Sequence, residues 1–217
     1  MDAYELVRGP LAGLSFFLCA AGICYKYGIM ILSYRHSPLL YPEKSIPNGL
    51  KSMVFGSFPL VTRTMRQKPL FSQITFCFHL CILILPLFLV AHIVLWSESF
   101  GIVWWGLPPI LADTMTVCVL VAAVFFLARR LLVRQVRDVS QLSDYLIVLL
   151  VFFVFLSGVL ASHHIGPYRQ MLVLHILCGE ILLISIPFSK LSHMLFFGFS
   201  RSYLGGEYGR VLGSGDW

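Results

Sequence analysis

Residues Ile186–Met194 read IPFSKLSHM and lie near the end of a long apolar run, in which a second histidine, His175, stands 18 positions before His193. Ionisable side chains are costly in lipid and mark a functional site when they occur there. Lipid is the solvent that the composition indicates. The chain of 217 residues is 58% hydrophobic and 12% charged, whereas soluble domains carry about 25% charged residues. We therefore expect an integral membrane protein that crosses the bilayer several times.

Five apolar segments are long enough to cross a bilayer, which takes roughly 20 helical residues. They cover about 10–34, 71–96, 107–130, 143–161 and 169–199. No segment alternates as the strand of a membrane barrel would, so the sequence predicts an all-α, five-transmembrane-helix bundle in a single membrane domain over 1–217. A loop over 35–70 and a tail over 200–217 complete it. Met53, Phe55 and Phe58 indicate that this loop packs against another surface.

The basic residues predict the direction of the spans. They gather in the loop over 35–70, between the third and fourth spans, and in the tail. By the positive-inside rule the N-terminus lies outside the cytoplasm, which would be periplasmic in a bacterial inner membrane, and the C-terminus is cytoplasmic. The net charge of +6 is thus explained by membrane orientation, and no nucleic-acid partner is expected.

Four histidines lie inside two of the predicted spans, which run antiparallel: His79 and His92 in the second, His175 and His193 in the fifth. His79 and His193 lie toward the cytoplasmic side (the inner pair), and His92 and His175 toward the opposite side (the outer pair). Haem iron accepts two axial imidazoles, and bundle cores commonly hold cofactors. The 18-residue spacing is five full turns, so His175 and His193 share a face. The pattern predicts two haem b groups.

The second span fits this interpretation less directly. His79 and His92 are 13 residues apart, which places them roughly 140° apart around a straight helix. Pro86 lies between them and Pro187 lies between the other two, and a proline can change the phase of a helix. A lone intramembrane histidine can instead be a hydrogen-bonded helix contact or part of a quinone or proton site. A zinc or copper site would need ligands at one depth.

Cations near the histidines are candidates to bind the haem propionates. Arg169 precedes His175 by six residues and would serve the outer haem, and Lys190 and Arg35 would serve the inner one. The alternative for each is an interfacial anchor with its charge in the headgroup region. We assign that anchoring role to Lys26 in the first span.

Acids and loop histidines could form a quinone or proton site. Asp113 and Glu180 lie within apolar runs, and His163 and His164 form a loop between the last two spans. Quinol oxidation releases protons that such groups can accept. Alternatively, Asp113 interacts with a helix N-terminus, the two histidines belong to a polar loop, and Glu180 pairs with a hydroxyl or a water.

The stretch IPFSKLSHM resembles the Pro-Phe-Ser/Thr-Lys/Arg-Leu-x-His signature in the last membrane helix of the gamma subunit of respiratory nitrate reductase. The resemblance implies five spans, an outside N-terminus and two b-type haems ligated from the second and fifth helices. This chain departs from that family in helix two, where the family's histidines usually lie closer together. The tail Gly205–Arg210, GGEYGR, and the opening Val7–Pro10, VRGP, resemble the membrane cytochromes b of sulfate reducers. Those proteins work beside a cytoplasmic iron–sulfur subunit similar to heterodisulfide reductase and beside multihaem cytochromes c.

These observations together predict an electron-transfer subunit of a respiratory oxidoreductase complex. It would move electrons between menaquinone or a periplasmic partner and a cytoplasmic iron–sulfur subunit. Three alternatives remain: a haem-free membrane anchor, a quinol-oxidising gamma subunit of a nitrate reductase, and a transporter with a proton relay. A relay should show a more continuous series of polar residues along the spans.

Overall fold

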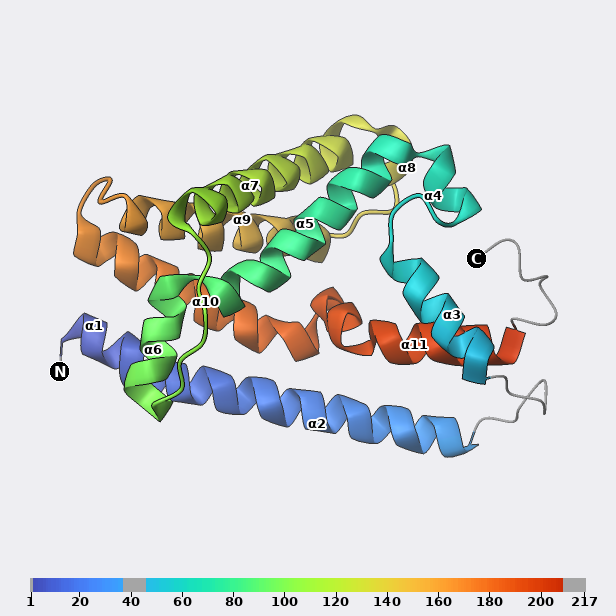
Figure 1. The fold of residues 1–217 in the computed structure, drawn as a ribbon, viewed down its shortest axis with the longest axis horizontal. Helices are drawn as coiled ribbons and strands as arrows, with labels where there is room; N and C mark the ends of the chain where they lie inside the picture. The colour runs from blue at the N-terminus through green and yellow to red at the C-terminus, as the bar shows by residue number, and fades with distance from the viewer. Residues whose placement is uncertain (1, 37–45, 209–217) are drawn as a thin grey trace. The chain divides into compact units, whose positions relative to one another are not determined.

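The computed structural model describes residues 2–36 and 46–208, with side chains over 2–33 and 46–206. Regular structure in this part of the chain is entirely helical (Figure 1). Its elements are α1 (Ala3–Leu6), η1 (Val7–Leu11), α2 (Ala12–His36), α3 (Ile46–Ser57), α4 (Arg63–Gln67), α5 (Pro69–Phe88), α6 (Val90–Phe100), α7 (Pro109–Leu132), α8 (Arg134–Arg137), α9 (Leu142–Ser162), α10 (Tyr168–Phe188), η2 (Lys190–Ser192) and α11 (His193–Tyr208).

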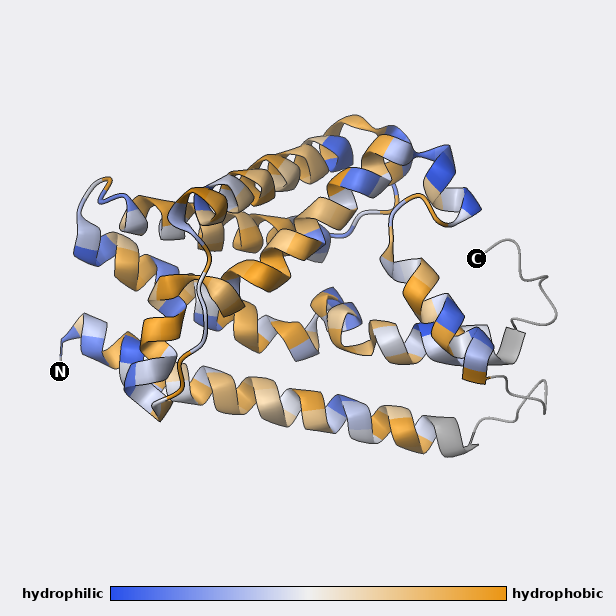
Figure 2. Cartoon of the chain, in the orientation of Figure 1, coloured by the Kyte–Doolittle hydropathy of each residue, from blue (hydrophilic) through white to orange (hydrophobic). Residues whose placement is uncertain are grey.

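Five helices are long and apolar enough to cross a membrane: Ala3–Ser33, Pro69–Phe88, Pro109–Leu132, Leu142–Ser162 and Tyr168–Phe188. Figure 2 shows the long apolar stretches along them. At most 28% of the most apolar window of any span is buried within the protein, so most of this apolar surface faces outward, as lipid contact requires. The predicted helical class and the number of spans are confirmed, and the protein is of the multi-pass membrane type. The sidedness of the termini stays a prediction.

Two of the spans are shorter than expected. The predicted helix over 71–96 is broken at Leu89, which is extended (φ −72°, ψ 127°), and the chain resumes as α6. The predicted helix over 169–199 is broken at Ser189, also extended (φ −123°, ψ −173°), before η2 and α11. Each break follows a proline, Pro86 or Pro187, by two or three residues. Proline lacks the N–H of the helical hydrogen bond and its ring clashes with the preceding turn.

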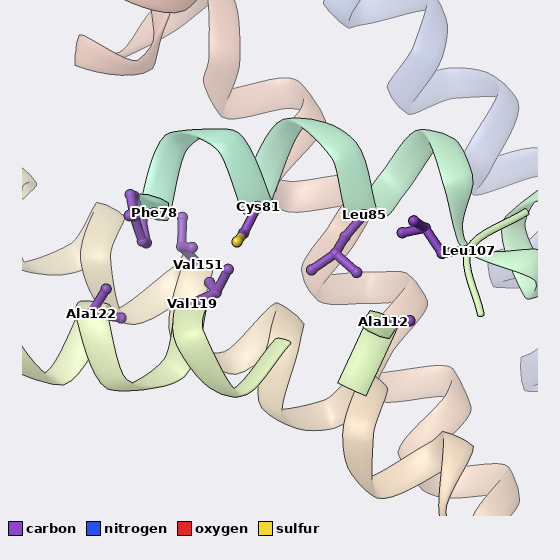
Figure 3. Packing of buried hydrophobic residues seen from close by; sticks show 9 residues of the cluster. Phe78, Cys81, Leu85, Leu107, Ala112, Val119, Ala122 and Val151 are labelled. Atoms are coloured by element: carbon purple, nitrogen blue, oxygen red, sulfur yellow. The ribbon is translucent and has the colours of Figure 1, made fainter. Parts of the chain in front are cut away.

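The chain divides into two compact units: Met1–Ala12 with Ile74–Leu182, and Gly13–Gln73 with Leu183–Trp217. The first unit contains the principal apolar core (Figure 3). Phe78, Cys81 and Leu85 line one face of α5 and pack on Val119 of α7 and Val151 of α9. These positions of α5 are three or four residues apart, so they form a single stripe on the helix.

In the second unit, α3 packs against α11 at very short range. The described part of the segment expected to be a loop contains the helices α3 and α4, and the surface on which α3 packs is α11 of the same chain. A Cβ added at Gly49 would lie 2.7 Å from the backbone oxygen of Ser202, and one added at Gly205 would lie 2.3 Å from the Cβ of Ser52. Small residues therefore let the two backbones approach.

Candidate functional site

The outer pair of histidines comes together in the first unit. His92 on α6 and His175 on α10 are partly buried, and their ring centroids lie 6.0 Å apart with an angle of 11° between the ring planes. Rings in face-to-face contact would be about 3.5–4 Å apart. These two imidazoles are therefore parallel but separated.

The break at Leu89 explains how His92 reaches this position. A straight helix would carry His92 roughly 140° away from the face of His79, and the extended residue resets the phase before α6 begins. The break also leaves the last carbonyls of α5 without helical partners. Other groups of the same unit donate to them: His92 Nδ1 to Pro86 O at 3.0 Å, Trp104 Nε1 to Leu87 O at 2.8 Å, and Leu107 N–H to Phe88 O at 2.8 Å. The broken helix end is thus hydrogen-bonded throughout.

His175 is positioned by α9. Its Nδ1 donates to the carbonyl of Val154 at 2.9 Å. The ring lies over Gly158, where an added Cβ would be 3.1 Å from His175 Cε1 and 3.2 Å from Nδ1. Neither Val154 nor Gly158 was identified from the sequence. The only signal there is a run of small residues at 157, 158 and 161 in an otherwise apolar helix.

The two histidines of the inner pair fall in different units, His79 in the first and His193 in the second. In the first unit His79 Nδ1 donates to the carbonyl of Thr75, one turn earlier on α5, at 2.7 Å. In the second unit His193 Nδ1 donates to the carbonyl of Lys190 at 2.7 Å.

The local structure of IPFSKLSHM explains the hydrogen bond between the His193 ring and the Lys190 carbonyl. The helical ladder of α10 ends after Pro187, and the Ser189 side chain caps η2 by accepting from the Leu191 N–H at 3.2 Å. The Ser192 hydroxyl donates to the Ser189 carbonyl at 2.9 Å. This single tight turn brings the Lys190 carbonyl within reach of the His193 ring.

All four histidines share one hydrogen-bond pattern: Nδ1 meets a backbone carbonyl. A carbonyl can only accept, so Nδ1 carries the proton in each ring. A neutral imidazole protonated at Nδ1 has its lone pair on Nε2, the form that binds a metal, and a second-shell carbonyl of this kind orients metal-binding histidines generally.

The outer pair also fits the dimensions of a shared metal. Imidazole nitrogens bind metals at about 2.0–2.1 Å, so two that share one ion are about 4 Å apart and their ring centres about 6 Å apart. Among the residues described, no group of three or more His, Cys, Asp or Glu side chains could hold a metal. Two imidazoles alone do not make a zinc site, but they complete the coordination of a haem. That the four histidines bind iron stays a prediction.

The residues predicted for a quinone or proton site are only partly brought together. His163 Nε2 and Asp113 Oδ1 lie 3.2 Å apart, with side chains 48% and 50% exposed, and they join the end of α9 to the start of α7. His164 turns the chain with a positive φ of 53° and packs on the Tyr168 ring instead. Glu180 is buried in α10, and neither of its carboxylate oxygens has a hydrogen-bond partner among the described residues.

The predicted propionate ligands have different surroundings. Arg169 forms an ion pair with Asp2. Lys190 lies in η2, where its carbonyl accepts from His193. Arg35 is in the last turn of α2, and its side chain lies outside the described residues.

The N-terminal segment connects the two helices that carry the outer pair. Asp2 binds Arg169 on α10, and Arg8 binds Glu98 on α6. We call these two ion pairs the N-terminal clasp. The clasp was not foreseen, because nothing in the sequence pairs residues 90 or more positions apart.

No protein-family model matches the chain, and no solved structure matches it either. One curated protein, from Nitratidesulfovibrio vulgaris strain Hildenborough and described simply as "Protein", is 34% identical over 212 residues. The alignment covers 94% of this chain and 93% of that protein. Identity of this degree over nearly the full length of both proteins shows that the chain belongs to the same family as this N. vulgaris protein.

Proposed function

We propose that the chain is the dihaem b-type cytochrome subunit of a respiratory redox complex in the bacterial inner membrane. The observation that carries the proposal is the outer pair, two parallel imidazoles with centroids 6.0 Å apart, each held through Nδ1 by a backbone carbonyl. In His92 and His175 the Nδ1 bond leaves Nε2 as the metal-binding atom.

Bound haem would supply one-electron transfer, and the chain's residues would hold it. His92 and His175 would ligate the outer haem, and His79 and His193 the inner one. The carbonyls of Pro86, Val154, Thr75 and Lys190 fix the tautomer and ring orientation of these histidines. Electrons would pass between menaquinone or a periplasmic multihaem cytochrome c and a cytoplasmic iron–sulfur subunit.

The experiment is a reduced-minus-oxidised spectrum of the purified chain, with haem and protein quantified together. We expect two b haems per chain. His92→Ala and His175→Ala should each lose the outer haem, and His79→Ala and His193→Ala the inner one. His163→Ala and His164→Ala are the matched controls and should keep both haems. A folded preparation without haem would refute the proposal and favour a haem-free membrane anchor.

One observation favours quinol oxidation, the activity of a nitrate reductase gamma subunit, as a second candidate. The pair of Asp113 and His163 is half exposed, and its members are 3.2 Å apart. Oxidation of a quinol releases two protons with two electrons, and a carboxylate–imidazole pair can accept a proton. Haem reduction by a menaquinol analogue should then slow by about 10²-fold in Asp113→Asn. Unchanged reduction in this variant would leave the periplasmic cytochrome as the electron donor or acceptor.

A further inference from the structure

Lys26 of α2 lies beside the turn that precedes His193. Its Nζ donates to the hydroxyl oxygen of Ser192 at 3.3 Å, and the Ser192 hydrogen is directed to the Ser189 carbonyl. The next residue, Tyr27, donates to the Leu195 carbonyl at 3.1 Å, and its ring packs on Phe196 at 4.8 Å. Two consecutive residues of α2 thus contact the end of η2 and the start of α11. All of these contacts lie within the second unit.

This placement differs from that of an interfacial anchor. A lysine that only anchors a helix extends its ammonium toward water, whereas Lys26 is partly buried and directed at a protein hydroxyl. An ammonium has three donors, and among the described residues Ser192 is the only hydrogen-bond partner of Lys26. Two donors therefore remain for another acceptor.

The described side chains of the second unit include no Asp or Glu, so none of them offers Lys26 a carboxylate. The described cations of this unit are Lys26, Lys51, Arg63, Arg66, Lys68, Lys190 and Arg201. A partly buried cation is stabilised by an anion, so the counter-charge for Lys26 must come from outside these side chains.

We propose that Lys26, oriented by Ser192, binds a carboxylate of the cofactor that His193 ligates, which is a propionate of the inner haem. The inference rests on the proposed function. The hydroxyl that accepts from Lys26 belongs to the residue directly before the ligand, so the ammonium and the imidazole are positioned by the same turn. The lysine of the first span, predicted from sequence to be an anchor, becomes a cofactor-binding residue.

A lipid phosphate is the other anion that could meet an ammonium in a membrane protein. The haem propionate and the lipid phosphate can be distinguished by measuring the reduction potential of the inner haem. If Lys26 binds a propionate, its substitution changes the reduction potential of the inner haem alone. If it binds a lipid phosphate, that potential depends on which lipid is supplied.

The test is redox potentiometry of Lys26→Met in a His175→Ala background, which should hold the inner haem alone. Loss of a nearby cation stabilises the oxidised haem, so the midpoint potential should fall. We expect about a tenfold change in the reduction equilibrium, equal to about 59 mV for one electron. Lys26→Arg should restore the potential. The control Lys51→Met removes a lysine whose ammonium lies over the Phe55 ring and should leave the midpoint potential of the inner haem unchanged.

Each outcome separates this inference from the proposed function. An inner haem with an unchanged potential in Lys26→Met overturns the inference and leaves the dihaem assignment intact. Loss of the inner haem in Lys26→Met that Lys26→Arg repairs supports the inference, while loss in both variants overturns it in favour of a packing role. A wild-type potential that changes between nanodiscs of phosphatidylcholine and of phosphatidylglycerol assigns the ammonium to a lipid phosphate and also overturns it. Absence of haem from folded wild-type protein defeats the proposed function itself.

Discussion

Gly158 offers a direct test of how the outer pair is held, because a side chain there must displace His175. An added Cβ would lie 3.1 Å from Cε1, and ordinary contacts begin at 3.4 Å. The ring must therefore move by a few tenths of an ångström. A shift of that size lengthens the 2.9 Å bond from Nδ1 to the Val154 carbonyl toward the limit of a hydrogen bond.

The expected magnitudes follow from the cost of overpacking. Gly158→Ala should weaken cofactor binding at the outer pair by about 1 kcal/mol and Gly158→Val by about 2–3 kcal/mol. These values correspond to losses in affinity of about fivefold and of about 30- to 150-fold. The assay is haem content per chain during dilution into detergent, with the outer haem resolved by its spectrum. The inner haem of each variant is the internal reference.

Gly28 on α2 provides the control, because a Cβ added there meets nothing within 4 Å. Gly28→Ala and Gly28→Val introduce the same side chains into a membrane helix that carries none of the four histidines. Both variants should keep both haems. The reasoning is refuted if Gly158→Val retains an outer haem with wild-type affinity while the chain stays folded.

Three further substitutions test other features. Glu180→Met removes a buried carboxyl group without a described partner and should raise the free energy of unfolding by about 1–3 kcal/mol; a lower melting temperature in detergent would show that the carboxyl group has a partner. Ser189→Ala removes the cap of η2 and should cost about 1 kcal/mol, seen as broadening of the inner haem's spectrum alone, whereas an unchanged spectrum would mean that the turn forms without its cap. Gly205→Ala would place a Cβ 2.3 Å from the Ser52 Cβ and should separate α3 from α11, with about tenfold faster tryptic cleavage after Lys51; Gly28→Ala, in open space, is its control, and equal rates for both variants would contradict the packing.

Hydropathy located the five spans, because the length of an apolar run depends on local sequence alone. The breaks were foreseen only as possible effects of Pro86 and Pro187, since a proline permits a kink without fixing which residue becomes extended. That residue proved to be Leu89 in the second span. The 13-residue spacing of His79 and His92 therefore argued against a position for His92 opposite the fifth span. In the structure the break allows the His92 ring to lie parallel to the His175 ring.

The supports of the site could not be predicted in the same way. Trp104 caps Leu87, and Gly158 admits the His175 ring, through contacts 17 residues apart in both cases. Whether a glycine faces a ligand or lipid depends on the rotation of its helix against a neighbour. Arg169 was predicted to bind a propionate of the outer haem, which stays a prediction, and its partner in the structure is Asp2, 167 residues earlier in the sequence.

The N-terminal clasp imposes an order on biosynthesis. Arg8 is made about 90 residues before its partner Glu98, and Asp2 about 167 residues before its partner Arg169. The clasp therefore cannot close until the last membrane helix has been inserted. Until then the helices that carry His92 and His175 are not tied together at that end. Between synthesis of α6 and synthesis of α10 only the Arg8–Glu98 pair can form, so the N-terminal segment holds α6 before it can hold the helix that carries His175.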